Sequence, residues 1–250
     1  MRFILGMVVV FILSTSYRPF QNSELDSNPL SLTDTLSTNS IKDNNSFLTK
    51  EKFLYSTIDF TKGDILNEEV FNKAFQGYTR LQEAGLIPME SSLLTICDFS
   101  LSSNKKRMWI IDLKTGEVLF NTLVAHGKNT GDEFATNFSN IESSLQSSMG
   151  FYLTSDTYFG ENGYSLRLQG MDEGFNDRAL ARSIVLHGAK YVSEDFANKH
   201  KRIGRSWGCP AVPSELAVPI IDSIKGNNVL FIYYPDNKYL ESSKWLATNS

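Results

Sequence analysis

The sequence contains two cysteines and three histidines, and one residue of each type stands in a setting that suits nucleophilic chemistry. Cys209 lies in "GRSWGCPAV", among small and turn-forming residues. His187 ends the apolar run "SIVLHG" and is followed by Gly188. An imidazole beside a thiol favours the nucleophilic thiolate and lowers the pKa of the thiol. A strand that ends at His187 and a turn that presents Cys209 can bring the two side chains together.

The glycine before the cysteine has a chemical use of its own. Without a Cβ, Gly208 lets a substrate carbonyl approach the backbone closely. The amides of Gly208 and Cys209 can then stabilise the oxyanion that develops during attack on that carbonyl. Spacing alone also fits a cysteine and a histidine that fill a core, so the pair needs support from the rest of the chain.

The other cysteine has a simpler interpretation. Cys97 lies in "LLTICDF", a run typical of a buried strand, where a thiol behaves as a small apolar side chain. We expect Cys97 to be reduced, because a bridge to Cys209 would silence the nucleophile unless it served as a redox switch. Cys209 and His187 do not complete a four-ligand metal site. We therefore expect no metal and no other cofactor.

The runs around these residues predict a mainly β fold (β-rich α+β). Short stretches of β-branched and aromatic residues predict strands, and Lys114-Thr115-Gly116 and Glu161-Asn162-Gly163 predict hairpin turns. Apolar residues recur on one helical face of "NEEVFNKAFQGYTRLQEAGLIP" after a capping Asn67, and "SELAVPIIDSIKG" predicts a second helix capped by Ser214. We interpret the first helix as one that packs on the main domain.

The chain start has the pattern of a secretory signal peptide over residues 1–16, with Arg2 before a short apolar run. That run is about half the roughly 20 residues that a membrane span needs, and a retained anchor is the alternative. Residues 17–63 predict a flexible tether, because residues 22–46 are rich in Ser, Thr, Asn and Asp. We expect a helical segment over 64–88, a catalytic domain over 89–236 and a C-terminal tail over 237–250.

The composition sets limits on partners and location. The net charge of −4 offers no basic surface for nucleic acid. The N-terminal pattern predicts export to the periplasm or cell envelope. The oligomeric state is left open by the sequence.

The segment from His187 to Cys209 resembles the active-site segment of YkuD-type murein L,D-transpeptidases. Their signature is a histidine, a gap and then Ser/Thr-His-Gly-Cys, which here reads His187, Ser206, Trp207, Gly208 and Cys209. The similarity is greatest to the branch that carries "GRS-x-GCPA", and "VAHGKNTG", "FSN", "SSMGFYLT" and "YSLRLQGMDEGFN" match it too. The resemblance covers roughly residues 90–235. It implies an L,D-transpeptidase catalytic β-sandwich or barrel with a few packed helices.

The resemblance also implies a reaction on peptidoglycan stem peptides, as donor and acceptor. Cys209 would attack the carbonyl between the L-centre of a diamino acid and the terminal D-alanine of a tetrapeptide stem. A thioester forms, D-alanine leaves, and an amine of a neighbouring stem takes the acyl group. His187 would be the base, oriented by a group near Gly188. The alternatives are an L,D-carboxypeptidase, in which water is the acceptor, and a catalytically idle peptidoglycan-binding module.

Further residues are candidates for substrate binding. Arg205 can bind a carboxylate through its guanidinium or hold the cysteine loop through backbone carbonyls. Trp207 stands where many relatives have histidine, and its indole can only donate a hydrogen bond or pack. His126, in "VAHGKNTG", is either a hairpin-end residue or a second histidine of the site. Candidates for the wall of the site are Ser206, Tyr191 and Arg167.

Overall fold

The computed structural model describes residues 52–247, which belong to the second of two units, Met1–Asn44 and Asn45–Ser250. The predicted signal peptide and most of the predicted tether therefore lie outside the described residues. The strands are β1 (Leu93–Asp98), β2 (Met108–Asp112), β3 (Glu117–Thr122), β4 (Gly150–Gly160), β5 (Gly163–Gly170), β6 (Val185–Ala189), β7 (Ala211–Pro213) and β8 (Val229–Tyr233). The labelled helices are η1 (Phe60–Lys62), α2 (Glu68–Glu83), α3 (Glu194–His200), α4 (Ser214–Ile224) and α5 (Asn237–Ser242).

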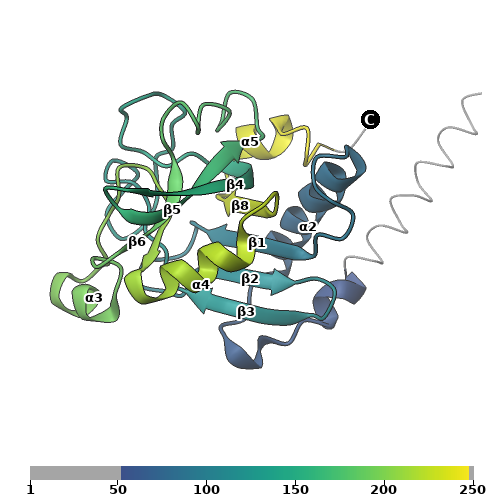
Figure 1. Ribbon diagram of the computed structural model, residues 1–250, viewed down its shortest axis with the longest axis horizontal. Helices are drawn as coiled ribbons and strands as arrows, with labels where there is room; N and C mark the ends of the chain where they lie inside the picture. Colours follow the sequence, from purple (N-terminus) through teal and green to yellow (C-terminus); the bar gives the residue numbers. More distant parts are fainter. Residues whose placement is uncertain (1–51, 248–250) are drawn as a thin grey trace, which may run out of the picture. The chain divides into compact units, whose positions relative to one another are not determined.

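The strands form one sheet in the order β3-β2-β1-β8-β4-β5-β6-β7 (Figure 1). The predicted hairpins β2–β3 and β4–β5 turn at Gly116 and Gly163, whose φ angles are 74° and 78°. Beyond β3 the chain continues to a bridge between Ala125 and Ala211, so it meets β7 at the opposite edge of the sheet. The sheet is therefore nearly closed, and the predicted mainly β class with a few helices is confirmed.

The two faces of the sheet pack against different helices. On β8, Val229 and Phe231 belong to the apolar cluster that contains the buried face of α2. Leu230 and Ile232 belong to the cluster that contains the buried face of α4. Alternate residues of a strand point to opposite faces. Helices α2 and α4 therefore cover opposite faces, and the strands between them are buried on both sides.

Helix α2 begins where the sequence predicts it. The Asn67 side chain accepts hydrogen bonds from the amides of Glu69 and Val70, which caps the helix. At Gly77 an added Cβ would lie 2.0 Å from the Phe151 ring, so the glycine lets the helix lie directly on β4. The helix packs on the main sheet, as predicted.

The predicted cap of α4 is wrong in detail. Ser214 is already the first helical residue, and Pro213 occupies the cap position without a side-chain hydrogen bond. Helix α3, which the sequence did not predict, is capped by the Ser193 hydroxyl, which accepts from the Phe196 amide. Short polar helices of this kind lack the apolar periodicity that marks longer ones.

Both boundaries of the described unit extend beyond the expected catalytic domain. Ile58, inside the expected tether, is buried, and the Trp109 Nε1–H donates to the Asp64 carbonyl at 2.7 Å. In the expected tail, Tyr239 and Trp245 are buried against the core. The described parts of the tether and the tail therefore pack on the sheet, because a few large apolar side chains anchor otherwise polar segments.

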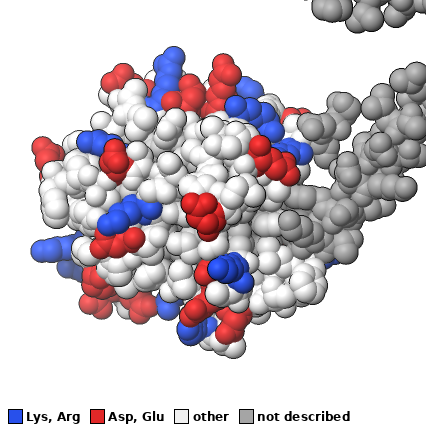
Figure 2. All heavy atoms as spheres, turned by 45° about the vertical axis from the view of Figure 1, so that its right-hand side comes forward, with Lys and Arg blue, Asp and Glu red and all other residues white. Residues whose placement is uncertain are grey.

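The surface carries interspersed charges of both signs. Figure 2 shows lysine and arginine side chains beside aspartate and glutamate side chains on the face that it presents. Among residues 52–247, no helix has both the length and the apolar character that a membrane crossing requires.

Candidate active site

Cys209 lies beside strand β6, in the turn that leads into β7. Strands β6 and β7 are parallel, with His187 opposite Ala211. The amide of Val185, two residues before His187, donates to the Sγ of Cys209, two residues before Ala211, at 3.5 Å. Cys209 and His187 both line a cavity of about 640 Å³.

The His187 ring is oriented by the backbone of the next residue. Its Nδ1 lies 3.0 Å from the Gly188 carbonyl oxygen. A carbonyl only accepts, so Nδ1 carries the proton and Nε2 keeps its lone pair. Burial lowers the pKa of His187, which keeps the ring neutral at neutral pH. Gly188 is required here because an added Cβ would lie 2.8 Å from the Ala217 Cβ on α4.

The pKa and the contacts of the Cys209 thiol differ from the sequence-based expectation. Burial raises its pKa, against the smaller lowering effects of the Val185 amide and the Arg182 charge. The thiol also lies 3.8 Å from the Ser183 carbonyl, to which it donates. The described residues hold no hydrogen bond between Cys209 Sγ and the imidazole. His187 is not among the groups that shift the pKa of this thiol.

Ser206 closes the cysteine turn. Its hydroxyl donates to the Cys209 carbonyl at 2.6 Å and accepts from the Gly208 amide at 3.0 Å. The Gly208 amide is thus already engaged, and the idea that it helps to bind an oxyanion is wrong for this conformation. The Cys209 amide has no such partner within the described part of the chain. Gly208 is needed for its φ of 128°, and an added Cβ there would lie 2.7 Å from the Gln146 carbonyl oxygen.

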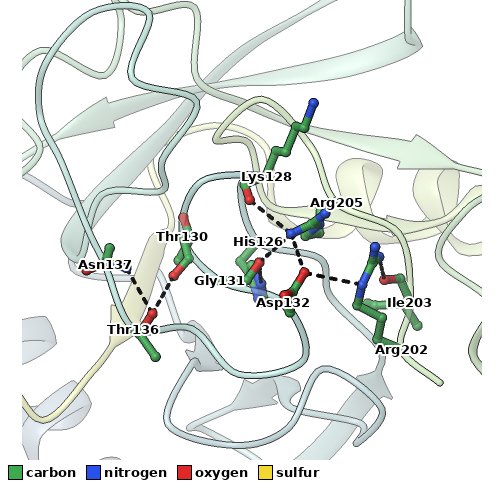
Figure 3. A network of polar contacts seen from close by, with 10 residues as sticks. All are labelled: His126, Lys128, Thr130, Gly131, Asp132, Thr136, Asn137, Arg202, Ile203 and Arg205. Atoms are coloured by element: carbon green, nitrogen blue, oxygen red, sulfur yellow. Dashed lines mark hydrogen bonds and ion pairs between the residues drawn. The ribbon is translucent and has the colours of Figure 1, made fainter. Parts of the chain in front are cut away.

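Arg205 holds the loop next to the cysteine turn. Its Nη1 donates to the carbonyl oxygens of Lys128 (3.1 Å) and Gly131 (2.9 Å) and to Asp132 Oδ1 (2.7 Å), as Figure 3 shows. Of the two roles that the sequence left open, the backbone-holding role is the one present. Arg205 also lines the cavity.

His126 is a structural residue of the same loop. It is 1% exposed and is not among the residues that line the cavity. The Arg107 guanidinium donates to its Nδ1 at 2.8 Å, and its Nε2 donates to the Gly131 carbonyl at 3.3 Å. Burial and the Arg107 charge lower the pKa of His126 to about 4. The interpretation as a second histidine of the site is wrong, because the ring is buried behind the loop.

The remaining candidates divide between the cavity and its surroundings. Trp207 lines the cavity and is 78% exposed, so the indole stands at the mouth without a packing role. Tyr191 lines the cavity too, and burial raises the pKa of its phenol to about 12. Arg167 is not a lining residue. Its guanidinium stacks 4.2 Å from the centre of the Tyr158 ring, which does line the cavity.

Arg182 is a cavity residue that the sequence analysis missed. Its Nη1 donates to the Ser139 carbonyl at 2.6 Å and to the Ser148 hydroxyl. Its Nη2 donates to the Ser144 hydroxyl at 3.2 Å and to the Gln146 carbonyl at 2.6 Å. An arginine just before an apolar strand carries no signal of such a role, because its partners lie far away in an irregular segment.

The other titratable groups of interest lie apart from the cavity. Cys97 is fully buried, and burial raises the pKa of its thiol to about 12. Cys97 and Cys209 are both free, as the sequence predicts. Among residues 52–247 there is no cluster of three or more His, Cys, Asp or Glu side chains that could hold a metal ion.

A family model described as the L,D-transpeptidase catalytic domain matches residues 62–233. The chain belongs to this family. The match covers the sheet, the cavity and the cysteine turn, and it confirms the resemblance based on the motif around Cys209. Its range also begins near η1, in agreement with the packed position of the residues before α2.

Solved structures with some likeness to this chain include L,D-transpeptidase 1 of Mycobacterium tuberculosis, at 12% identity over 57% of this chain and 62% of that chain, with a TM-score of 0.33. The helical cell shape determining protein Pgp2 of Campylobacter jejuni is 13% identical over 66% and 57%, with a TM-score of 0.37. An L,D-transpeptidase of Stackebrandtia nassauensis is 13% identical over 75% and 90%, with a TM-score of 0.36.

These likenesses add no argument beyond the family match, because the identities and TM-scores are low. The chain spans less than two thirds of the first solved structures that it matches. No curated protein sequence matches it.

Proposed function

We propose that the protein is an exported peptidoglycan L,D-transpeptidase with Cys209 as nucleophile and His187 as base. One observation carries the proposal. In a chain of the L,D-transpeptidase catalytic domain family, both residues line the same cavity of about 640 Å³ from adjacent segments of one sheet.

The first half of the reaction is acyl transfer to the enzyme. Cys209 Sγ attacks the carbonyl carbon between the L-centre of the diamino acid and D-alanine, while the thiol proton passes to His187 Nε2. The C–N bond then breaks, the D-alanine nitrogen takes the proton from Nε2, and a thioester remains on Cys209. The neutral imidazole and its Gly188 contact support this role, since they leave Nε2 free to accept.

The second half of the reaction transfers the acyl group to an acceptor. An amine of a second stem attacks the thioester carbon and loses a proton to Nε2. The C–S bond breaks, the sulfur takes that proton back, and an amide crosslink is released. The unpartnered Cys209 amide is the group we assign to the oxyanion in both halves.

The same cavity supplies the substrate contacts that we propose. Trp207 and Tyr191 offer apolar faces at its mouth and wall, and the free N–H groups of Arg205 can bind a stem carboxylate. Export follows from the substrate, which lies outside the cytoplasmic membrane, and from the pattern of residues 1–16. That stretch lies outside the described residues.

The test is incubation of the purified protein with a disaccharide tetrapeptide, followed by mass spectrometry of the products. We expect D-alanine release and a crosslinked dimer, and no release by Cys209→Ala. Cys97→Ala is the matched control and should keep turnover. Tripeptide without dimer would assign the carboxypeptidase reaction. Equal turnover in Cys209→Ala and the parent, or no release by the parent, would overturn the proposal.

A further inference from the structure

Arg182 uses every terminal N–H of its guanidinium within one segment. The four acceptors all lie in residues 139–148, which we call the wall segment. These residues do not line the cavity themselves, and Arg182, which does, contacts them. Ser183, the next residue along the chain, accepts from the Cys209 thiol. Arg182 thus joins the chain next to the nucleophile to the wall segment.

The wall segment in turn contacts the cysteine turn. The Ser147 hydroxyl donates to the Gly208 carbonyl at 3.0 Å. The Gln146 carbonyl, which accepts from Arg182, lies so near Gly208 that an added Cβ would be 2.7 Å from it. The turn that carries Cys209 therefore rests on a surface that Arg182 fixes in place.

The charge of Arg182 is not neutralised by a neighbouring carboxylate. Within residues 52–247 no ion pair includes it, and its buried Nε has no hydrogen-bond partner. The titratable groups that share the cavity with Arg182 and Cys209 are Tyr158, Glu161, His187, Tyr191 and Arg205. Tyr152, fully buried, also interacts with the guanidinium.

We propose that Arg182 is a positioning residue of the reaction, which braces the wall segment against the cysteine turn and supplies the fixed positive charge beside the nucleophile. This proposal rests on the proposed function, in which Cys209 reacts. It assigns to a permanent cation the effect on the thiol that the sequence analysis ascribed to the imidazole. The distinction matters because a guanidinium keeps its charge at every working pH, whereas buried His187 is neutral.

The direction of the electrostatic effect supports the assignment. The Arg182 charge lowers the pKa of the Cys209 thiol, while burial raises it by more. No contribution from His187 accompanies these. Loss of the guanidinium should therefore make the thiolate harder to form.

The experiment measures iodoacetamide alkylation of Cys209 against pH, with intact-protein mass spectrometry to follow each cysteine. We expect Arg182→Gln to slow alkylation about tenfold at neutral pH, equivalent to a pKa rise of about one unit. Arg182→Lys keeps the charge and should lie close to the parent profile. Arg178→Gln is the matched control, because Arg178 is exposed on the same segment and should change nothing.

Cys97 reports on folding in the same samples, because it is buried and reacts only when the chain opens. If Arg182→Gln is folded and its profile matches the parent, the proposal is overturned. If Arg182→Gln does not fold, the amide hydrogen exchange and the kcat of Arg182→Lys are compared with those of the parent instead. Loss of amide protection in the wall segment together with a lower kcat supports the brace, and unchanged protection and kcat overturn it. The alkylation profile needs no peptidoglycan, so its failure is distinguishable from absence of transpeptidation.

Discussion

The hydroxyl of Ser206 spans the cysteine turn, donating to the carbonyl of Cys209 at 2.6 Å and accepting from the amide of Gly208 at 3.0 Å. Ser206 is itself fixed from outside the turn, since its amide donates to the His126 carbonyl and its carbonyl accepts from the Lys128 amide. The position of the nucleophile is thus set by one buried hydroxyl and by the loop that follows β3.

Replacement of Ser206 by alanine should loosen this turn. The Gly208 amide and the Cys209 carbonyl would both lose their partner, with a loss of about 1–3 kcal/mol in the free energy of unfolding. D-Alanine release should fall with it, because the turn would no longer fix the position of Sγ. Urea unfolding and turnover give the two values, and Ser206→Thr is the control that keeps the hydroxyl. A Ser206→Ala protein as stable and as active as the parent would contradict this role.

His126 should make the fold sensitive to acid. Its pKa is about 4 in the folded protein and 6.5 in an unperturbed chain, so the unfolded state binds more protons between those values. The stability contributed by neutral His126 is complete above pH 6.5 and is lost as the pH falls towards 4, by about 3 kcal/mol in total. Urea unfolding at a series of pH values measures the slope.

The control for this prediction is His126→Gln, which cannot titrate. Its stability should be lower than that of the parent at pH 7 but should depend less on pH between 4 and 6.5. Equal slopes in the two proteins would assign the acid sensitivity to another group.

Trp207 should matter for substrate and not for stability. The side chain is 78% exposed, so Trp207→Ala removes little buried surface and should leave the thermal midpoint unchanged. Loss of the indole ring at the cavity mouth should raise KM about fivefold, which corresponds to about 1 kcal/mol of substrate binding free energy. Phe159→Ala is a matched control, since Phe159 is 82% exposed but does not line the cavity. A fall in thermal midpoint with an unchanged KM would show a structural role instead.

Ser243 should anchor the end of the chain to the body of the fold. Its hydroxyl donates to the buried carboxylate of Asp172, which also accepts from the Phe151 amide at 2.7 Å and from the Tyr239 hydroxyl at 3.2 Å. Ser243→Ala should lower the free energy of unfolding by about 1–3 kcal/mol, because a buried carboxylate loses a donor. Thermal unfolding of each variant measures the effect. Ser242 is exposed, and Ser242→Ala should leave the thermal midpoint unchanged. Equal midpoints for the two variants would contradict the prediction.

Local signals in the sequence account for much of the fold. The strand that delivers His187, the turn at Cys209 and the cap of α2 are each encoded within a few neighbouring residues, and the structure has all three. The family match over residues 62–233 confirms the motif that first indicated the chemistry. Such features depend on backbone preference and periodicity, which a single stretch of chain carries.

Contacts between distant segments account for what the sequence did not predict. The glycines around His126 indicate a loop, but burial of the ring depends on Arg107, which donates from the other side of the β2–β3 hairpin. The brace of Arg182 depends on an irregular wall segment without periodicity. The burial of Tyr239 depends on Asp172 and on a sheet completed elsewhere in the chain. None of these partners is recognisable from the residues next to it.

The placement of β8 has a consequence for how the molecule is made. Strand β8, the last one among residues 52–247, lies between β1 and β4, where it is parallel to β1 and antiparallel to β4. Until β8 is available, β1 and β4 each have an unpaired side, and the two parts of the sheet are joined through the bridge between Ala125 and Ala211 instead. Contacts between residues so far apart form slowly. A chain synthesised from its N-terminus therefore completes this sheet only after residues 229–233 have been made, and a deletion that removes β8 separates β1 from β4 instead of trimming an edge.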